Sequence, residues 1–417
     1  VDAALARVKD IERKVAVLRA LAFKRPVPAR YQTADDFTKV VHREVVKDLP
    51  PARSKALSAA LAHLGFLTQP IDLAESIEHA TVTQAAAYYD PGAKAFFVVA
   101  VPENATMLDV ISAHELTHAL QDQHFDLEKF AGAPGQLDGD AAAARRFVPE
   151  GDATFVMMAY LLASSLGDKP WTTALPMVKA QLESMSNQDL ESLKAQLKSQ
   201  ADLMKGLGGD IQKSLDAMDQ IPPIVLVPLF ESYFKGAVVA MTAYEHGGWP
   251  AVDELYKHPP ESTEQVLHPD GKLFPTREHP HKVTLPEAKL PGATTDVLGE
   301  LSWQTYFAQW KVANGNEAAA GWGGDRFVVT AGKEGALTGR IATVWDSEAD
   351  AAQFVTAYVA SLSARFPGTD SHAPEAGIAR SDGGRVFVRR VGNKVFIVDG
   401  ASDHRAIDAL LRDAKFD

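Results

Sequence analysis

Residues 113–125 read Ala-His-Glu-Leu-Thr-His-Ala-Leu-Gln-Asp-Gln-His-Phe, and their histidine spacing is the starting point for interpreting this chain. His114 and His118 are four residues apart, so on a helix they lie about 40° apart around the axis, one turn above the other. Two imidazoles presented in this way can bind one Zn²⁺, with Glu115 projecting beside them. Ala113, Leu116 and Leu120 recur on the opposite face, which predicts a helix with one buried side. The alternative is an exposed His/Glu face that binds no metal.

A catalytic zinc site needs a third protein ligand and an open fourth position. The best candidate is Glu150, in Val-Pro-Glu-Gly-Asp-Ala-Thr at 148–154. Pro149 is typical of a first helical position, so we expect an apolar helix to begin here with Glu150 in its first turn, where the helix dipole keeps a carboxylate ionised. A plain acidic residue at a helix start is the alternative. Asp122, Asp152 and His124 are the next candidates for the third ligand.

These residues resemble the gluzincin class of zinc metallopeptidases, in which His-Glu-x-x-His is followed by a ligating glutamate on a later helix. The separation between His118 and Glu150 is longer than in thermolysin-like members, so the likeness concerns the zinc site and not that family. The chain after about residue 85 also resembles little-characterised bacterial zinc metallopeptidases, on the motifs already quoted and on Pro-Pro-Glu-Ser-Thr-Glu-Gln-Val-Leu-His-Pro (259–269) and Gly-Trp-Gly-Gly-Asp-Arg-Phe (321–327). The resemblance implies a zincin-like fold, a Zn²⁺ cofactor and hydrolysis of peptide bonds.

Composition narrows the class of protein. The chain has 417 residues and is 46% hydrophobic, enough for two or three packed domains. Its net charge of −12, with no long basic run, argues against nucleic acid or an anionic membrane as partner. It has no cysteine, which excludes disulfides, thiolate zinc ligands and a cysteine nucleophile. The apolar run at 155–166 is too short to cross a bilayer, so we expect no transmembrane segment. The chain begins at Val1 with no leader, so we expect an exported, processed protein or a trimmed one.

The region before the metal helix combines helices with one hairpin. We expect an N-terminal helical packing region over 1–84, with helices at 2–23, 33–48 and 51–64. Two apolar segments flank the turn Pro91-Gly92-Ala93-Lys94, which predicts a β-hairpin at 85–100. In zinc peptidases of this general build, a strand edge beside the metal helix pairs with the substrate backbone. A hairpin that only covers the core is the alternative.

We predict an α+β fold, mainly α. A zincin-like catalytic domain with its hairpin should occupy 85–321, with a helical cap at about 187–220 and a buried helix at 224–246. From residue 322, strands at 325–331, 339–345, 384–391 and 394–399 and helices at 347–363 and 402–414 predict a small ββαββα domain. That domain should pack on the catalytic unit or bind a protein partner.

The predicted activity is hydrolysis of a peptide or protein substrate. His114, His118 and Glu150 would bind Zn²⁺, and Glu115 would act as the general base. His268 and Tyr233 are the candidates for stabilising the oxyanion, and Asp122 or Asp152 is expected to orient a ligand. Two other functions fit the sequence, namely a hydrolase of non-peptide amides or esters and a zinc-stabilised binding or scaffold protein. An intact Glu115 favours an enzyme.

Overall fold

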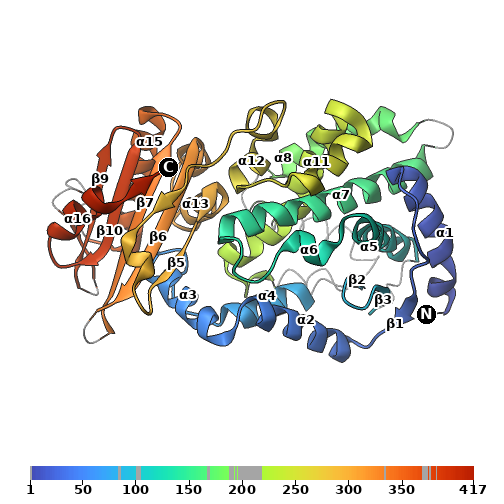
Figure 1. The fold of residues 1–417 in the computed structure, drawn as a ribbon, viewed down its shortest axis with the longest axis horizontal. Helices are drawn as coiled ribbons and strands as arrows, with labels where there is room; N and C mark the ends of the chain where they lie inside the picture. Colours follow the sequence, from blue (N-terminus) through green and yellow to red (C-terminus); the bar gives the residue numbers. More distant parts are fainter. Residues whose placement is uncertain are drawn as a thin grey trace.

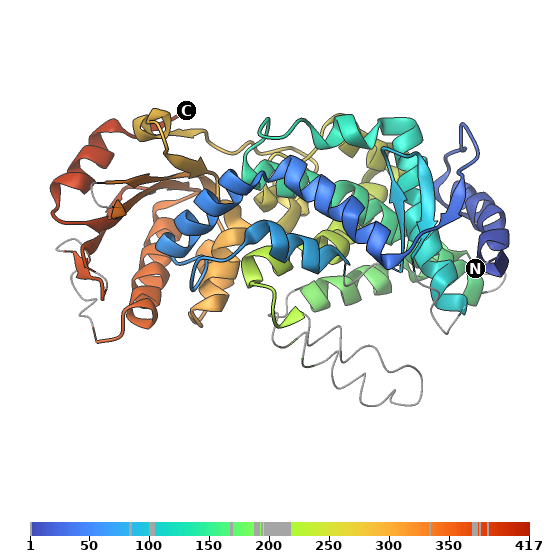
Figure 2. The ribbon, with the colours of Figure 1, turned by 90° about the horizontal axis from the view of Figure 1, so that it is seen from below.

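The computed structural model shows a mainly helical chain with sheets at both ends of an elongated molecule (Figures 1 and 2). The helix that carries His114 and His118 lies with the hairpin at one end, and the C-terminal sheet lies at the other. The structure describes residues 2–82, 86–99, 105–166, 170–186, 192, 195, 218–332, 335–368, 374, 377–381 and 383–417. The predicted cap at 187–220 therefore lies almost wholly outside the described residues.

The metal helix packs beside a three-stranded sheet. Helix α5 spans Ala105–Phe125, and strands β2 (Ala87–Asp90) and β3 (Ala95–Val98) pair antiparallel, which confirms the predicted hairpin. Strand β1 (Ala29–Tyr31) adds to β3 in parallel, so the order is β1-β3-β2 and β2 is an edge strand. Helix α1 (Asp2–Arg19) covers α5, and its Val8, Ile11 and Val15 are buried with Leu116 and Leu120 in one cluster.

Helix α7 carries Glu150, but it does not begin where the sequence predicted. It spans Gly139–Ser165, and the Asp138 side chain caps it by accepting from the Ala141 N–H. Pro149 lies inside the helix, so the expectation that Glu150 occupies a first turn was wrong. The alanine-rich segment at 141–144 favours helix strongly enough to extend α7 upstream of the proline. Glu150 therefore gains nothing from a helix N-terminus.

Helix α11 (Pro223–Lys257) crosses α7 at very short range. A Cβ built on Gly151 would lie 2.0 Å from the carbonyl carbon of Gly236, and one built on Gly236 would lie 2.6 Å from the carbonyl oxygen of Phe147. Helix α11 is long and apolar enough to cross a membrane by length and composition alone. Its apolar residues Val239, Ala240 and Met241 are buried in the core, and Gly247 and Gly248 interrupt its helical backbone.

The N-terminal helices run along the length of the molecule (Figure 1). Helices α2 (Ala34–Asp48) and α3 (Pro51–Leu64) match their predicted ranges, and α3 ends at Gly65, whose φ of 88° suits glycine. Helix α4 (Leu73–Val82) was not predicted. Leu61 and Leu64 of α3 are buried with Trp303 and Ile341 in the cluster around the C-terminal sheet. Helices of the 1–84 region therefore pack both on α5 and on the cluster around the C-terminal sheet.

Short elements fill the middle of the chain. They are α6 (Leu127–Ala131), η1 (Trp171–Ala174), α8 (Leu175–Ser186), α12 (Thr263–Leu267), η2 (Pro269–Leu273), β4 (Val283–Thr284), η3 (Pro286–Lys289), α13 (Gly299–Gln309) and α14 (Gly315–Ala319).

The C-terminal sheet has the predicted ββαββα series at its centre. Strands β6 (Trp322–Ala331), β7 (Leu337–Trp345), β9 (Arg385–Val391) and β10 (Lys394–Ala401) alternate with α15 (Glu348–Arg365) and α16 (Arg405–Asp413). The six-stranded order is β5-β6-β7-β10-β9-β8, with the edges formed by β5 (Thr294–Asp296) and β8 (Ile378–Ala379). Strand β11 (Lys415–Phe416) pairs with β4. Because β5 precedes residue 322, the sheet begins earlier than the predicted boundary.

The glycine contact between α7 and α11 gives a stability prediction. Gly151→Ala should destabilise the fold by about 1–3 kcal/mol, because the added methyl group must push two helix backbones apart. Denaturant unfolding measures the change. Gly332→Ala is the matched control, since its nearest neighbour would lie at 3.4 Å and the change should stay within about 0.5 kcal/mol. Equal stability of Gly151→Ala and wild type would contradict the close contact.

Candidate metal centre

Three side chains from two helices converge on one point. The Nε2 atoms of His114 and His118 are 3.1 Å apart. Glu150 Oε2 lies 3.4 Å from His114 Nε2 and 3.5 Å from His118 Nε2. All three side chains are largely buried. The structure therefore brings together the three residues that the sequence singled out, although 32 positions separate His118 from Glu150 (150 − 118).

The cluster fits a tetrahedral cation. Zinc–ligand distances of about 2.0–2.1 Å at tetrahedral angles set the ligand atoms about 3.3 Å apart, close to the spacing here. Glu150 Oε2 is buried and has no hydrogen-bond partner. A buried carboxylate oxygen in this condition can be satisfied by a bound cation. Burial alone would raise the pKa of Glu150, but the two histidines hold that pKa well below its usual range. The donor set of two imidazoles and one carboxylate is typical of zinc.

Hydrogen bonds fix the orientation and tautomer of His118. Its Nδ1 is 2.9 Å from Gln121 Oε1. The amide nitrogen of Gln121 donates to Pro149 O at 3.1 Å and to Asp152 Oδ2 at 3.2 Å, so its Oε1 must accept from His118. His118 Nδ1 therefore carries a proton, and Nε2 is the nitrogen that faces His114 and Glu150. Such outer partners orient metal ligands.

Asp152 is the centre of a buried network behind the cluster. It accepts from Gln121, from the Tyr256 hydroxyl at 2.9 Å and from Arg19 Nε at 2.8 Å. Arg19 is fully buried and also donates to Asp253 at 2.6 Å. The two carboxylates compensate the buried guanidinium. Of the two predicted orienting residues, Asp152 lies in contact with a partner of His118.

Asp122 has a different set of contacts, and with Glu115 it holds the hairpin against α5. The Tyr89 hydroxyl donates to Asp122 at 2.7 Å, and Lys94 Nζ donates to the same carboxylate at 3.1 Å. The backbone N–H of Tyr89 donates to Glu115 Oε2 at 2.9 Å. The edge strand β2 thus lies beside Glu115, and burial raises the pKa of this carboxyl.

The two candidate oxyanion donors lie in different places. The Tyr233 ring on α11 packs on His114, with ring centroids 5.6 Å apart, and the Glu150 charge followed by burial raises the pKa of its hydroxyl. Tyr233 therefore stays protonated and able to donate. His268 is not brought to the cluster, because its Nε2 bonds the fully buried Glu300 at 2.9 Å. His124 lies apart as well, with its Nε2 2.8 Å from Ala22 O.

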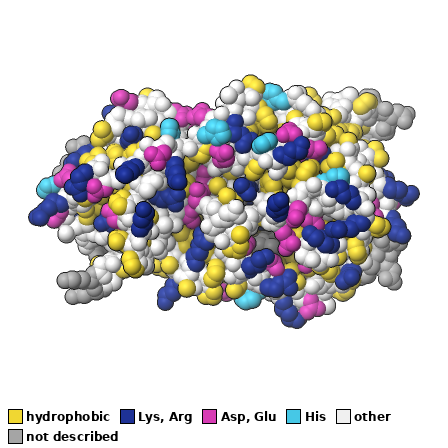
Figure 3. Space-filling view, in the orientation of Figure 1, with side chains coloured by type: hydrophobic (Ala, Val, Ile, Leu, Met, Phe, Trp, Pro, Cys, Tyr) yellow, Lys and Arg dark blue, Asp and Glu magenta, His cyan; other side chains and the backbone are white. Residues whose placement is uncertain are grey.

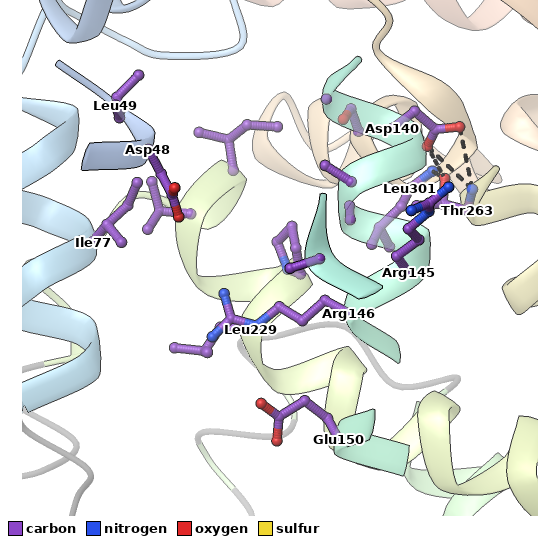
Figure 4. A pocket seen from close by; sticks show the side chains of 18 of the residues that line it. Asp48, Leu49, Ile77, Asp140, Arg145, Arg146, Glu150, Leu229, Thr263 and Leu301 are labelled. Atoms are coloured by element: carbon purple, nitrogen blue, oxygen red, sulfur yellow. Dashed lines mark hydrogen bonds between the residues drawn. The ribbon is translucent and has the colours of Figure 1, made fainter. Parts of the chain in front are cut away.

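A cavity of about 710 Å³ opens beside the cluster. Its lining includes His118, Glu150, Tyr89 and Pro91 and also Phe327 of the C-terminal sheet. Most of the remaining lining is apolar, and Figure 4 shows Glu150 projecting from α7 into this space. The volume falls within the range of about 300–1,000 Å³ typical of small-ligand sites.

A second group of acidic side chains among the described residues is paired with a lysine and needs no metal. Glu264, Glu278 and Asp346 lie together, but Lys272 Nζ is at 3.0, 2.8 and 2.6 Å from them and supplies the positive charge. Likewise, His279 Nδ1 lies 2.8 Å from Glu261 Oε2. Lysine, arginine and acidic side chains are intermixed on the face shown in Figure 3.

Sequence analysis missed Gln121, Tyr89 and Arg19. Gln121 lies three residues after His118, on the same face of a helix, which is a signal that the spacing offered. Arg19 and Asp152 are 133 positions apart, and their pairing has no local signal.

Comparison with known proteins covers only part of the chain. Residues 288–411 match a family described as Domain of unknown function (DUF8575). That match spans β5, α13 and most of the C-terminal sheet, and it excludes the metal cluster. No curated protein and no solved structure matches the chain.

Proposed function

We propose that the protein is a zinc-dependent metallopeptidase. The observation that supports this most strongly is the convergence of His114, His118 and Glu150 at ligand spacing, with Glu115 beside them and an open cavity in front. A purely structural zinc site is closed by four protein ligands and has no use for a neighbouring carboxylate base. The described residues supply three ligands, which leaves a position for water or substrate.

The residues of the chain divide the chemistry between them. A bound Zn²⁺ supplies a Lewis acid that polarises a carbonyl and makes a water nucleophilic near neutral pH. The Glu115 carboxylate takes the proton of the attacking water and returns it to the leaving nitrogen. The Tyr233 hydroxyl donates a hydrogen bond to the developing oxyanion. Gln121 keeps His118 in the tautomer that presents Nε2.

The hairpin and cavity supply the substrate-binding surface in this proposal. An extended peptide can pair with the edge strand β2, whose Tyr89 N–H donates to Glu115 of α5. Its side chains would then enter the apolar cavity. A peptide backbone suits this arrangement better than a small ester or amide, because an edge strand offers repeated backbone hydrogen bonds.

The metal itself gives the first test of the function. Elemental analysis after zinc loading should find about one zinc per chain, and His114→Ala or His118→Ala should abolish binding. Glu150→Ala should weaken zinc affinity by at least about a hundredfold, measured by chelator competition, because one of three ligands is lost. Glu254→Ala is the control, since this exposed residue forms its ion pairs with the nearby Lys257 and His258. A wild-type protein that stays metal-free would end the proposal, and unchanged affinity in Glu150→Ala would place the third ligand elsewhere.

Glu115→Gln separates catalysis from structure. The glutamine can still accept from the Tyr89 N–H, so the hairpin should keep its place and zinc content should match wild type. Turnover should fall at least about a hundredfold, because the base is gone. Peptide-library digestion with a fluorogenic readout measures the change. Wild-type turnover in this variant would rule out Glu115 as the base.

Tyr233→Phe tests the oxyanion donor, with His268→Ala as its partner variant. Loss of the Tyr233 hydroxyl should lower kcat by on the order of a hundredfold with little change in KM or zinc content. His268→Ala should instead lower the melting temperature and spare kcat, because it leaves Glu300 buried without its hydrogen bond. The reverse outcome, with kcat damaged only in His268→Ala, would assign the donor role to the histidine.

A further inference from the structure

Arg146 lies at the edge of the candidate metal centre and has no ion-pair partner among the residues that the structure describes. It lies four residues before Glu150 on α7, and Figure 4 shows both side chains projecting to the same side, into the cavity. Its guanidinium has no hydrogen bond or ion pair with any residue that the structure describes, and the side chain is exposed within the cavity. The adjacent Arg145 differs, because its Nη1 donates to Phe130 O at 3.0 Å.

Elsewhere in the fold, buried arginines are neutralised by carboxylates. Arg19 bonds Asp152 and Asp253, and Arg365 bonds Asp399 at 3.1 Å. The walls around Arg146 are largely apolar, with Leu49, Ile77 and Leu229 among the residues in Figure 4. An anion entering such a space interacts with Arg146 more strongly than it would in bulk water.

None of the nearby acidic groups that the structure describes forms an ion pair with Arg146. Glu150 is directed to the two histidines. Asp48, at the end of α2, lines the same cavity and forms no ion pair with Arg146. A free guanidinium beside an apolar surface matches a ligand that combines a carboxylate with apolar side chains.

We propose that Arg146 is a specificity-determining residue that binds a carboxylate of the substrate next to the scissile bond. This inference rests on the proposed peptidase function and names its substrate class, namely peptides that carry a carboxylate and apolar residues. Four residues of helix separate Arg146 from Glu150 by about 6 Å along the axis. Two residues of extended peptide span about 6.6–7 Å. The carboxylate therefore lies one or two residues from the cleaved bond, either as the C-terminus or as an Asp or Glu side chain.

Two matched peptide series test the proposal on zinc-loaded protein and distinguish the sources of the carboxylate. The first compares a free C-terminus with a C-terminal amide, and the second compares internal Glu with Gln in amidated peptides. In one series or both, wild type should prefer the carboxylate member by roughly ten- to a hundredfold in kcat/KM. Arg146→Gln should remove the preference, and Arg146→Glu should reverse it.

A control and a binding measurement complete the test. Arg405→Glu makes the same charge change on exposed α16, outside the cavity, and should keep the wild-type preference. Fluorescence anisotropy of the same peptides on Glu115→Gln reports affinity without turnover. If wild type cleaves no peptide, the proposed function fails. The anisotropy data then still show whether Arg146 binds the carboxylate of a peptide. Equal binding and cleavage within both pairs, or a preference that persists in Arg146→Gln, would overturn the inference.

Discussion

The close contact of α7 and α11 at Gly151 and Gly236 determines where the candidate site can form. With no side chain at either position, the two backbones approach until a single added carbon would overlap a carbonyl. Glu150 immediately precedes that contact and faces the histidines, and Tyr233 on α11 packs against His114. A wider helix separation would move the Tyr233 ring away from the cluster. The glycine in Glu-Gly-Asp is therefore a geometric requirement of the site.

Asp152, on the other side of Gly151, ties the same motif to the N-terminal helix. Its carboxylate accepts from Gln121 and from the buried Arg19, so the position of His118 depends on a salt bridge to α1. Breaking such a buried pair by removing one partner typically costs about 3–5 kcal/mol. Side-chain contacts thus connect His118 on α5, through Gln121 and Asp152, to Arg19 on α1. In these three consecutive residues, Glu150 is a candidate ligand, Gly151 makes the close contact with α11, and Asp152 binds Arg19 of α1.

Sequence analysis found what depends on local spacing. The histidine spacing on one helix, the Pro-Gly hairpin turn and the strands of the C-terminal domain are each encoded within a few consecutive residues. Local sequence patterns were therefore enough to predict them. It placed the start of α7 wrongly because Pro149 is a helix-start signal only when no stronger cap lies upstream, and Asp138 provides one. It could not tell which way His268 faces, because Glu300, its partner, lies 32 positions later. Residues that meet across such distances need the tertiary fold.

The cavity depends on the tertiary fold and cannot be read from the histidine motif of α5 or from the Glu-Gly-Asp motif of α7. It is lined by residues of the N-terminal helices, α7, α11 and the first strands of the C-terminal sheet, so its walls come from segments far apart in the chain. The C-terminal region packs on α7 and α11 through Leu301 of α13, which is buried in the same cluster as Phe147 and Val239. A substrate held here would contact Phe327 and Arg146 at once. The C-terminal domain therefore helps to shape the cavity beside the candidate site, even though it provides none of the metal-ligand candidates.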